Sequence, residues 1–196
     1  MSLYNAEISA GSLLVAESRK IAQLLLTHPT PEQWDVAIKG DNILQKSHTT
    51  ARRQARLLRN RLDTLDEEGW LFIATGDGEL CGQVLLAAAI RHSRLLGDFM
   101  RNVYASDLRQ LERQLSHRQW DAFLADCEHQ DDAVGTWAGS TRLKLFQVIV
   151  RILTETKYLD STKTMGLTPP MLHPQVRSYL KRLGDADTLQ RMEYNQ

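Results

Sequence analysis

The stretch ELCGQVLLAAAIRHSRLLGDFMRNVY, residues 79–104, decides the fold that we expect for this chain. Its centre is an unbroken apolar run at residues 84–90, and the whole stretch is too apolar to lie on a protein surface. We therefore predict a long central helix, bent near Gly97. The apolar run is far shorter than the roughly 20 residues that a membrane span needs, so we expect no membrane partner.

The segments on both sides of the central helix also place their apolar residues at helical spacing. Thr30 with Gln33 is typical of a helix start, because the two side chains bond to free N–H groups of the first turn. The spacing predicts a basic helix closed by Gly69 and a final helix at residues 174–183, closed by Gly184. We therefore predict an all-α fold, and a length of 196 residues fits either one large or two small domains.

Residues 158–172 leave two interpretations open. They contain a Pro-Pro pair and scattered apolar residues, which fit either a short β-hairpin or an irregular loop. A helix, a hairpin and a further helix would be compatible with a winged-helix, helix-turn-helix-like module. The same pattern is equally compatible with a plain helical bundle.

The composition of the 196 residues is that of an ordinary soluble globular protein, with 42% hydrophobic and 24% charged residues. The amino terminus has neither the basic nor the apolar region of a signal peptide. Cys81 and Cys127 are isolated in the sequence, which indicates a reducing compartment and no disulfide. We therefore expect a cytoplasmic protein with two unpaired cysteines.

A second stretch, KSHTTARRQARLLRNR at residues 46–61, concentrates positive charge in a chain whose 24 Lys and Arg residues balance 24 Asp and Glu residues. At helical spacing, Ala51, Leu58 and Leu62 share an apolar stripe, and the arginines fall on another face. The planar guanidinium donates two parallel hydrogen bonds to a phosphate, so the face is typical of a site for a polyanion. The alternative is a solvated face, or one paired with the acids that follow it. The predicted DNA contacts of this segment are Lys46, Arg52, Arg53, Arg56, Arg59 and Arg61.

A further basic set lies in the carboxy-terminal half of the chain. Arg177 and Lys181 are four residues apart and would share a helical face. The alternative is a solvated surface with local pairing to Glu155, Asp160 and Asp185. The set consists of Arg142, Lys144, Arg151, Lys157, Lys163, Arg177, Lys181 and Arg182, of which we predict Arg142, Lys144, Arg177 and Lys181 as DNA contacts.

No stretch predicts an enzyme, a cofactor or a metal site. The glycines near Asp77 lack the Lys-Ser/Thr pair of a phosphate-binding loop. The His and acids that follow Cys127 lack the ligand spacing of a zinc site. His92 and Ser93 have no acid placed to complete a catalytic triad.

Three segments resemble the BrxA family, the small accessory proteins of BREX bacteriophage-exclusion systems. They are ISAGSLLVAES at residues 8–18, NILQK at 42–46 with the basic helix after it, and QVLLAAA at 83–89 with RLLGDF at 94–99. The resemblance implies an all-helical protein that binds DNA and is encoded beside a BREX methyltransferase and ATPases. It also implies two globular bundles, which we place in an extended arrangement at residues 1–103 and 104–196. It carries over no catalytic residue.

From the residues and the resemblance together, we expect a DNA-binding accessory protein of a phage-defence system. Double-stranded DNA is favoured for the basic helix, because no aromatic residue is interleaved with its arginines for stacking on bases. A different class of function stays open, in which the arginine face binds an acidic partner and the protein is a scaffold within the BREX complex. A helical RNA-binding or transcription-factor-like module is a third, weaker option.

Overall fold

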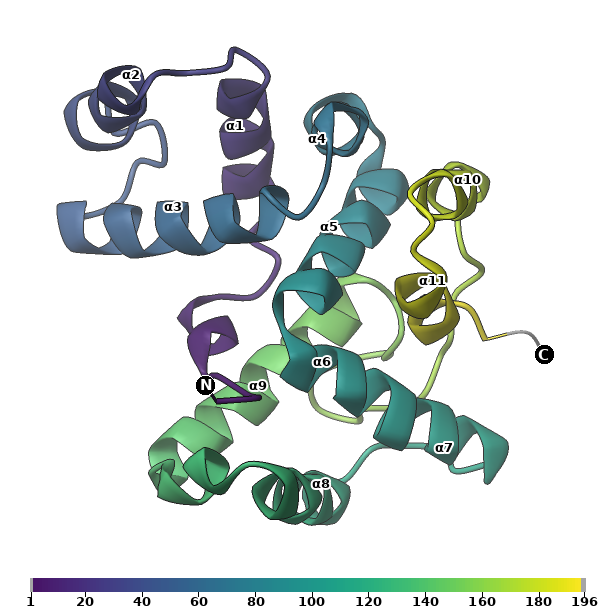
Figure 1. The fold of residues 1–196 in the computed structure, drawn as a ribbon. Coiled ribbons are helices and arrows are strands. Elements are labelled where there is room, and N and C mark those ends of the chain that lie inside the picture. Colours follow the sequence, from purple (N-terminus) through teal and green to yellow (C-terminus); the bar gives the residue numbers. More distant parts are fainter. Residues whose placement is uncertain (1, 195–196) are drawn as a thin grey trace.

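The computed structural model describes residues 2–194, which fold as an all-α protein, as predicted (Figure 1). Short 3-10 or π-helical turns, η1 (Glu7–Ala10), η2 (Val36–Gly40), η3 (Met100–Tyr104) and η4 (Asp132–Thr136), link or extend the α-helices. The α-helices are α1 (Val15–Leu25), α2 (Pro31–Asp35), α3 (His48–Leu62), α4 (Glu67–Thr75), α5 (Gly78–His92), α6 (Arg94–Phe99), α7 (Ala105–Arg109), α8 (His117–Gln130), α9 (Gly139–Glu155), α10 (Pro174–Arg182) and α11 (Ala186–Met192).

The predicted central helix is α5, in which every residue from 80 to 90 is buried. The bend, however, is at Ser93 and not at Gly97. Ser93 takes an extended backbone, and its hydroxyl accepts the Leu96 N–H at 3.3 Å, which starts α6 in a new direction. Gly97 lies inside α6, where a Cβ atom would be 1.9 Å from Nη1 of Arg191. The glycine is therefore needed for close packing and not for a bend.

The chain continues from α6 through η3 into α7 without leaving helical backbone angles. The predicted boundary between residues 103 and 104 lies inside this run, and the division into two bundles stays a prediction. One apolar core extends across both halves of the described chain. The turn η1 packs against both α3 and α9, and α10 and α11 return to pack against α5 (Figure 1).

The predicted capping at Thr30 is present, with reciprocal bonds between Thr30 and Gln33. The basic helix is shorter than predicted, because α3 ends at Leu62 and a separate helix, α4, follows. Asp66 caps α4 by accepting the Gly69 N–H at 3.1 Å. Gly69 therefore lies in the first turn of α4 and does not close the basic helix.

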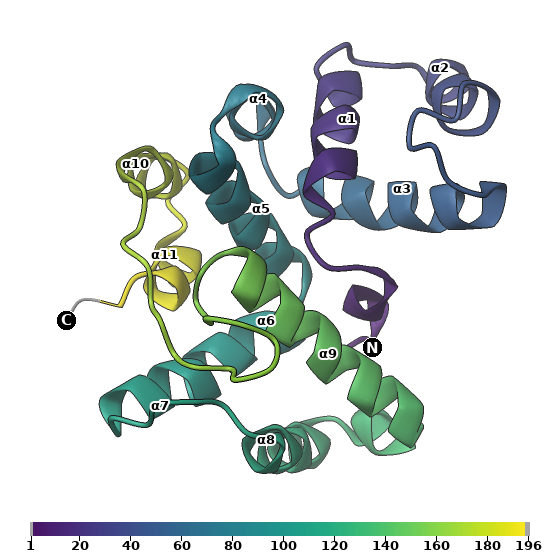
Figure 2. The ribbon, with the colours of Figure 1, turned by 180° about the vertical axis from the view of Figure 1, so that it is seen from behind.

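The carboxy-terminal part differs from the prediction in two places. Gly184 ends α10 with a left-handed backbone, as expected, but a further helix, α11, begins after the cap Asp185. Between residues 158 and 172 the described chain forms no strand. It makes only isolated bridges, Leu159 with Leu167 and Gln114 with Gly166. The possible hairpin of a winged-helix module is therefore a loop that curves beside α9 (Figure 2).

Cys81 and Cys127 are both buried and free, which confirms that they are unpaired. Among the described helices, none is both long and apolar enough to cross a membrane.

Candidate nucleic-acid interface

Helix α3 has the two faces that its sequence predicts. Ala51, Leu58 and Leu62 are buried on the side that packs on the body of the protein. Arg52, Arg53 and Arg56 are exposed on the other side. We call these three residues the α3 arginine face.

The acids near α3 neutralise its arginines unequally. Arg52 and Arg53 form no ion pair with any acid in residues 2–194, and the pair of Arg56 with Glu7 is loose, at 4.0 Å with the Arg56 side chain 78% exposed. Arg59 is held more firmly, with Nε 3.7 Å from Asp63 and the guanidinium 4.5 Å from the centre of the Trp34 ring. The α3 arginine face therefore keeps its charge, whereas Arg59 also supports local packing.

Shallow hollows flank the α3 arginine face. One of about 190 Å³ separates α3 from α2 and η2, and its lining includes Arg52, Arg56 and Trp34. Another of about 190 Å³ separates α3 from η1, and its lining includes Arg53 and Arg56. Asn60 lines both hollows. The arginines are thus arranged on a ridge between two concave surfaces.

The prediction for Arg61 was wrong, because this residue is buried with only 1% of its surface exposed. Its guanidinium donates hydrogen bonds to the carbonyls of Ser12, at 2.5 Å, and Gly11, at 3.0 Å. Burial lowers the pKa of Arg61 to about 10, partly opposed by the charge of Glu155. Arg61 follows the buried Leu58 by three residues and Leu57 by four, so it lies on their side of the helix. It fixes the segment before α1 and cannot reach DNA.

Lys46 lies before α3, and its Nζ is 3.0 Å from Oε1 of Glu17 in α1. Burial tends to raise the pKa of Glu17, but a hydrogen bond to Lys46, a backbone hydrogen bond and the charges of Lys46 and Lys20 together outweigh it and lower the pKa. The lysine is therefore partly neutralised by α1.

The second basic set does not form one surface. Arg142 donates to the carbonyls of Trp137, at 3.2 Å, and Val134, at 3.1 Å, so it holds the η4 turn. Arg177 is paired with Glu193. Lys144 and Lys181 are exposed and form no ion pair within the described chain. Of the four predicted contacts in this half, only these two lysines remain free for a ligand.

Lys144 lines a cleft of about 400 Å³ between α9 and residues 162–165. Arg151 and Lys163 line the same cleft, together with His117 at the start of α8. We call it the α9 cleft. Sequence reasoning placed the three cations in one larger basic set without separating them from it, and it did not include His117. The spacing of Lys144 and Arg151, seven residues apart on one helix face, was the available signal.

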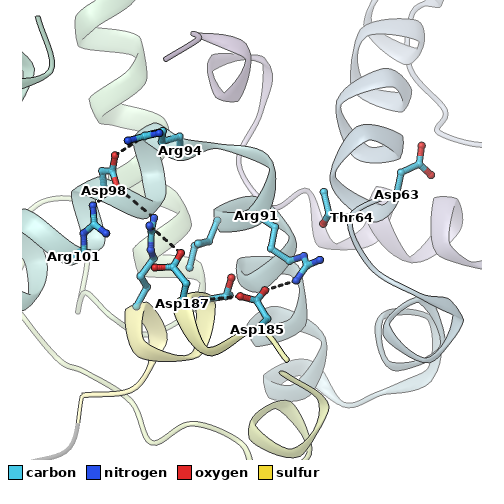
Figure 3. Close-up of a pocket in the computed structure, with 11 residues that line it drawn as sticks. Asp63, Thr64, Arg91, Arg94, Asp98, Arg101, Asp185 and Asp187 are labelled. Atoms are coloured by element: carbon cyan, nitrogen blue, oxygen red, sulfur yellow. Dashed lines mark hydrogen bonds and ion pairs between the residues drawn. The ribbon is translucent and has the colours of Figure 1, made fainter. Parts of the chain in front are cut away.

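A cavity of about 700 Å³ lies beside α5, α6 and α11 and is lined by arginines and aspartates in equal number (Figure 3). One of the lining residues, Asp98, is only 2% exposed. Its carboxylate accepts hydrogen bonds from the Tyr4 hydroxyl, at 3.0 Å, and from Arg101, at 2.9 Å. Arg94 and Arg191 also pair with Asp98. These charges neutralise one another and fasten α11 to α6, so the cavity does not offer a site for a polyanion.

The loop after Cys127, whose His and acidic residues were considered above as metal ligands, anchors another part of the chain. The carboxylate of Asp131 accepts the N–H groups of Leu3, at 2.6 Å, and Tyr4, at 2.9 Å, and so anchors the amino-terminal segment. Within residues 2–194, no group of three His, Cys, Asp or Glu side chains is placed to hold a metal ion.

With this geometry in place, comparison with known proteins decides the family. The BrxA family model matches residues 2–184. The chain belongs to the BrxA family. BrxA proteins are components of BREX phage-defence systems, and relatives called BREX protein BrxA occur in distant bacteria. The protein from Paramagnetospirillum magneticum is 41% identical over 91% of this chain and 90% of its own length. That from Escherichia coli O9:H4 is 34% identical over 95% of this chain and 88% of its own length.

The fold is also that of a solved structure. The crystal structure of an uncharacterized protein from Magnetospirillum magneticum superposes with a TM-score of 0.91 at 37% sequence identity. The match covers 97% of this chain and 98% of the other. The arrangement of helices around α5 is thus shared with a chain whose structure was determined by experiment.

Proposed function

We propose that this BrxA protein is a non-enzymatic DNA-binding accessory protein of a BREX system. Its main contact would be the α3 arginine face on the phosphate backbone of duplex DNA. The observation that carries the proposal is the exposure of Arg52, Arg53 and Arg56 on one helix, with only one loose carboxylate contact among them in the described part of the chain. Phosphates would take the place of the missing carboxylates, and the release of counterions from DNA would drive binding.

The chemistry of α3 favours contact with the backbone over reading of the sequence. Bidentate amide side chains are the usual readers of adenine. Near the arginine face, Gln54 has its Oε1 atom buried, and Asn60 is only partly exposed. We therefore expect binding with little sequence preference. Lys46 and Arg59 would add to the positive field without being the main contacts.

The test is a titration of labelled random-sequence duplex at several salt concentrations. Changing Arg52, Arg53 and Arg56 together to Ala should weaken binding to every sequence. It should also reduce the log–log salt slope by roughly 2.7, because each phosphate contact contributes roughly 0.9.

A matched control removes three exposed arginines elsewhere that form no ion pair in residues 2–194, Arg109, Arg113 and Arg118. This control should bind duplex nearly as the wild type does. If the α3 variant keeps its helical circular dichroism spectrum and binds as the wild type does, the proposal fails.

The alternative function is a protein–protein scaffold within the BREX complex. It is favoured by two exposed apolar side chains, Leu111 and Met171, each 87% exposed. A scaffold would show little salt-dependent DNA binding and would co-purify with BREX subunits. The wild-type salt titration therefore separates the two functions before any variant is made.

A further inference from the structure

The α9 cleft combines a positive rim with an apolar floor. Its rim carries Lys144 and Arg151 from α9 and Lys163 from the loop that curves beside it (Figure 2). None of the acidic residues that the structure describes lines it. Its volume of about 400 Å³ lies within the range of roughly 300–1,000 Å³ that is typical of small-ligand sites.

The three rim cations have no counter-charge. Several other surface arginines do meet carboxylates: Arg91 pairs with Asp185, and Arg182 with Asp66 and Glu68. In the part of the chain that the structure describes, no ion pair involves the three rim cations. Like charges held around a concave surface raise the local concentration of anions.

The floor of the cleft is apolar, and its α9 side chains are largely buried. Phe146, Val148 and Val150 contribute to the lining, with Met165 opposite them in the loop. The ring of His117 packs against Phe146 at 4.8 Å and an angle of 66°, which places an aromatic edge at the cleft. An inorganic anion would use only the rim, and an intact duplex is too wide to enter. A nucleotide with its base unpaired uses both the rim and the floor.

We propose that the α9 cleft binds an unpaired nucleotide of a single DNA strand. The backbone phosphates contact Lys144, Arg151 and Lys163, and the base lies on the apolar floor. The side chain of Gln147, which also lines the cleft, provides an amide for the edge of the base. This site is separate from the α3 arginine face and does not require it.

The experiment measures the anisotropy of a labelled oligothymidylate of about 12 nucleotides, a length typical of single-strand sites. Changing Lys144, Arg151 and Lys163 together to Gln should weaken binding at least about tenfold. It should also reduce the salt slope by roughly 2, because each contact on a single strand contributes roughly 0.7. Since all three side chains are exposed, the helical spectrum and the melting temperature should not change.

The matched control is the variant with Arg52, Arg53 and Arg56 changed to Ala, which loses the same number of positive charges. It should keep single-strand binding and lose duplex binding, and the cleft variant should do the reverse. A single-strand affinity that falls equally in both variants would show a diffuse charge effect and overturn the proposal. If the cleft variant binds the oligothymidylate as the wild type does, or the wild type does not bind it, the proposal also fails, whatever the duplex result.

A second probe tests the apolar floor. An abasic oligomer of the same length and charge should bind the wild type at least about fivefold more weakly, because each stacked base contributes a factor of that size. Equal binding of the two oligomers would reduce the cleft to a site for any polyanion, including an acidic peptide, and would refute the nucleotide assignment.

Discussion

Replacing Arg61 with Met is expected to destabilise the fold by about 2–4 kcal/mol and to leave the DNA affinity of the folded protein unchanged. The lost free energy of unfolding comes from two hydrogen bonds that Arg61 donates to the carbonyls of Gly11 and Ser12. A hydrogen bond with a charged donor contributes about 1.5–3 kcal/mol. Part of that loss is recovered, because Met fills a similar volume and removes a buried charge.

Thermal and urea unfolding, followed by circular dichroism, measure this effect. In a chain of this length a change of about 1 kcal/mol moves the melting temperature by about 2–4 °C. A loss of about 3 kcal/mol, the middle of the expected range, should therefore lower the melting temperature by about 9 °C. Arg53→Met in the same helix is the control. Arg53 is exposed, so its replacement should change stability by less than about 0.5 kcal/mol. It should instead reduce the salt slope of DNA binding by roughly 0.9.

The two variants therefore have opposite expected phenotypes. The reasoning is refuted if Arg61→Met melts with the wild type and weakens DNA binding as Arg53→Met does. That result would place Arg61 on the DNA-binding side of α3, as the sequence alone suggested.

Two further predictions concern buried or capping aspartates. Asp98→Ala should cost about 1–3 kcal/mol in urea unfolding, because it removes a buried acceptor from Tyr4 and from Arg191, whose side chain is only 11% exposed and keeps its pair with the exposed Asp187; a loss below about 0.5 kcal/mol would contradict this. Burial tends to raise the pKa of Asp66 from its ordinary value of 3.8, but a backbone N–H, the Tyr179 hydroxyl and Arg182 outweigh burial and lower it. The ionised carboxylate thus stabilises the fold above pH of about 4, and this contribution is lost as pH falls through the lowered pKa. The variant Asp66→Asn can still cap α4 but cannot ionise. Its melting temperature should therefore fall less than that of the wild type between about pH 7 and pH 3. An equal fall in the two proteins would show that the ionised carboxylate of Asp66 does not stabilise the fold.

Local features of the sequence determined the fold class and one face of the candidate site. The apolar run at residues 84–90 predicted α5, and the pattern at Thr30 predicted the start of α2, because periodicity and capping depend on residues a few positions apart. The same reasoning placed Arg52, Arg53 and Arg56 on the exposed side of α3. The similarity to BrxA was also carried by short segments that are visible in the sequence.

Tertiary structure decided which charges are free to bind. Arg61 and Arg53 look alike in the sequence, but Arg61 is used by carbonyls about 50 residues away and Arg53 is not. Arg142 is likewise bound to carbonyls of the η4 turn, and the loop after α9 brings Lys163 to the same cleft as Lys144. The physical reason is that burial and ion pairing depend on partners distant in the chain. Spacing along one helix shows which face a residue occupies, but it does not show what that face meets.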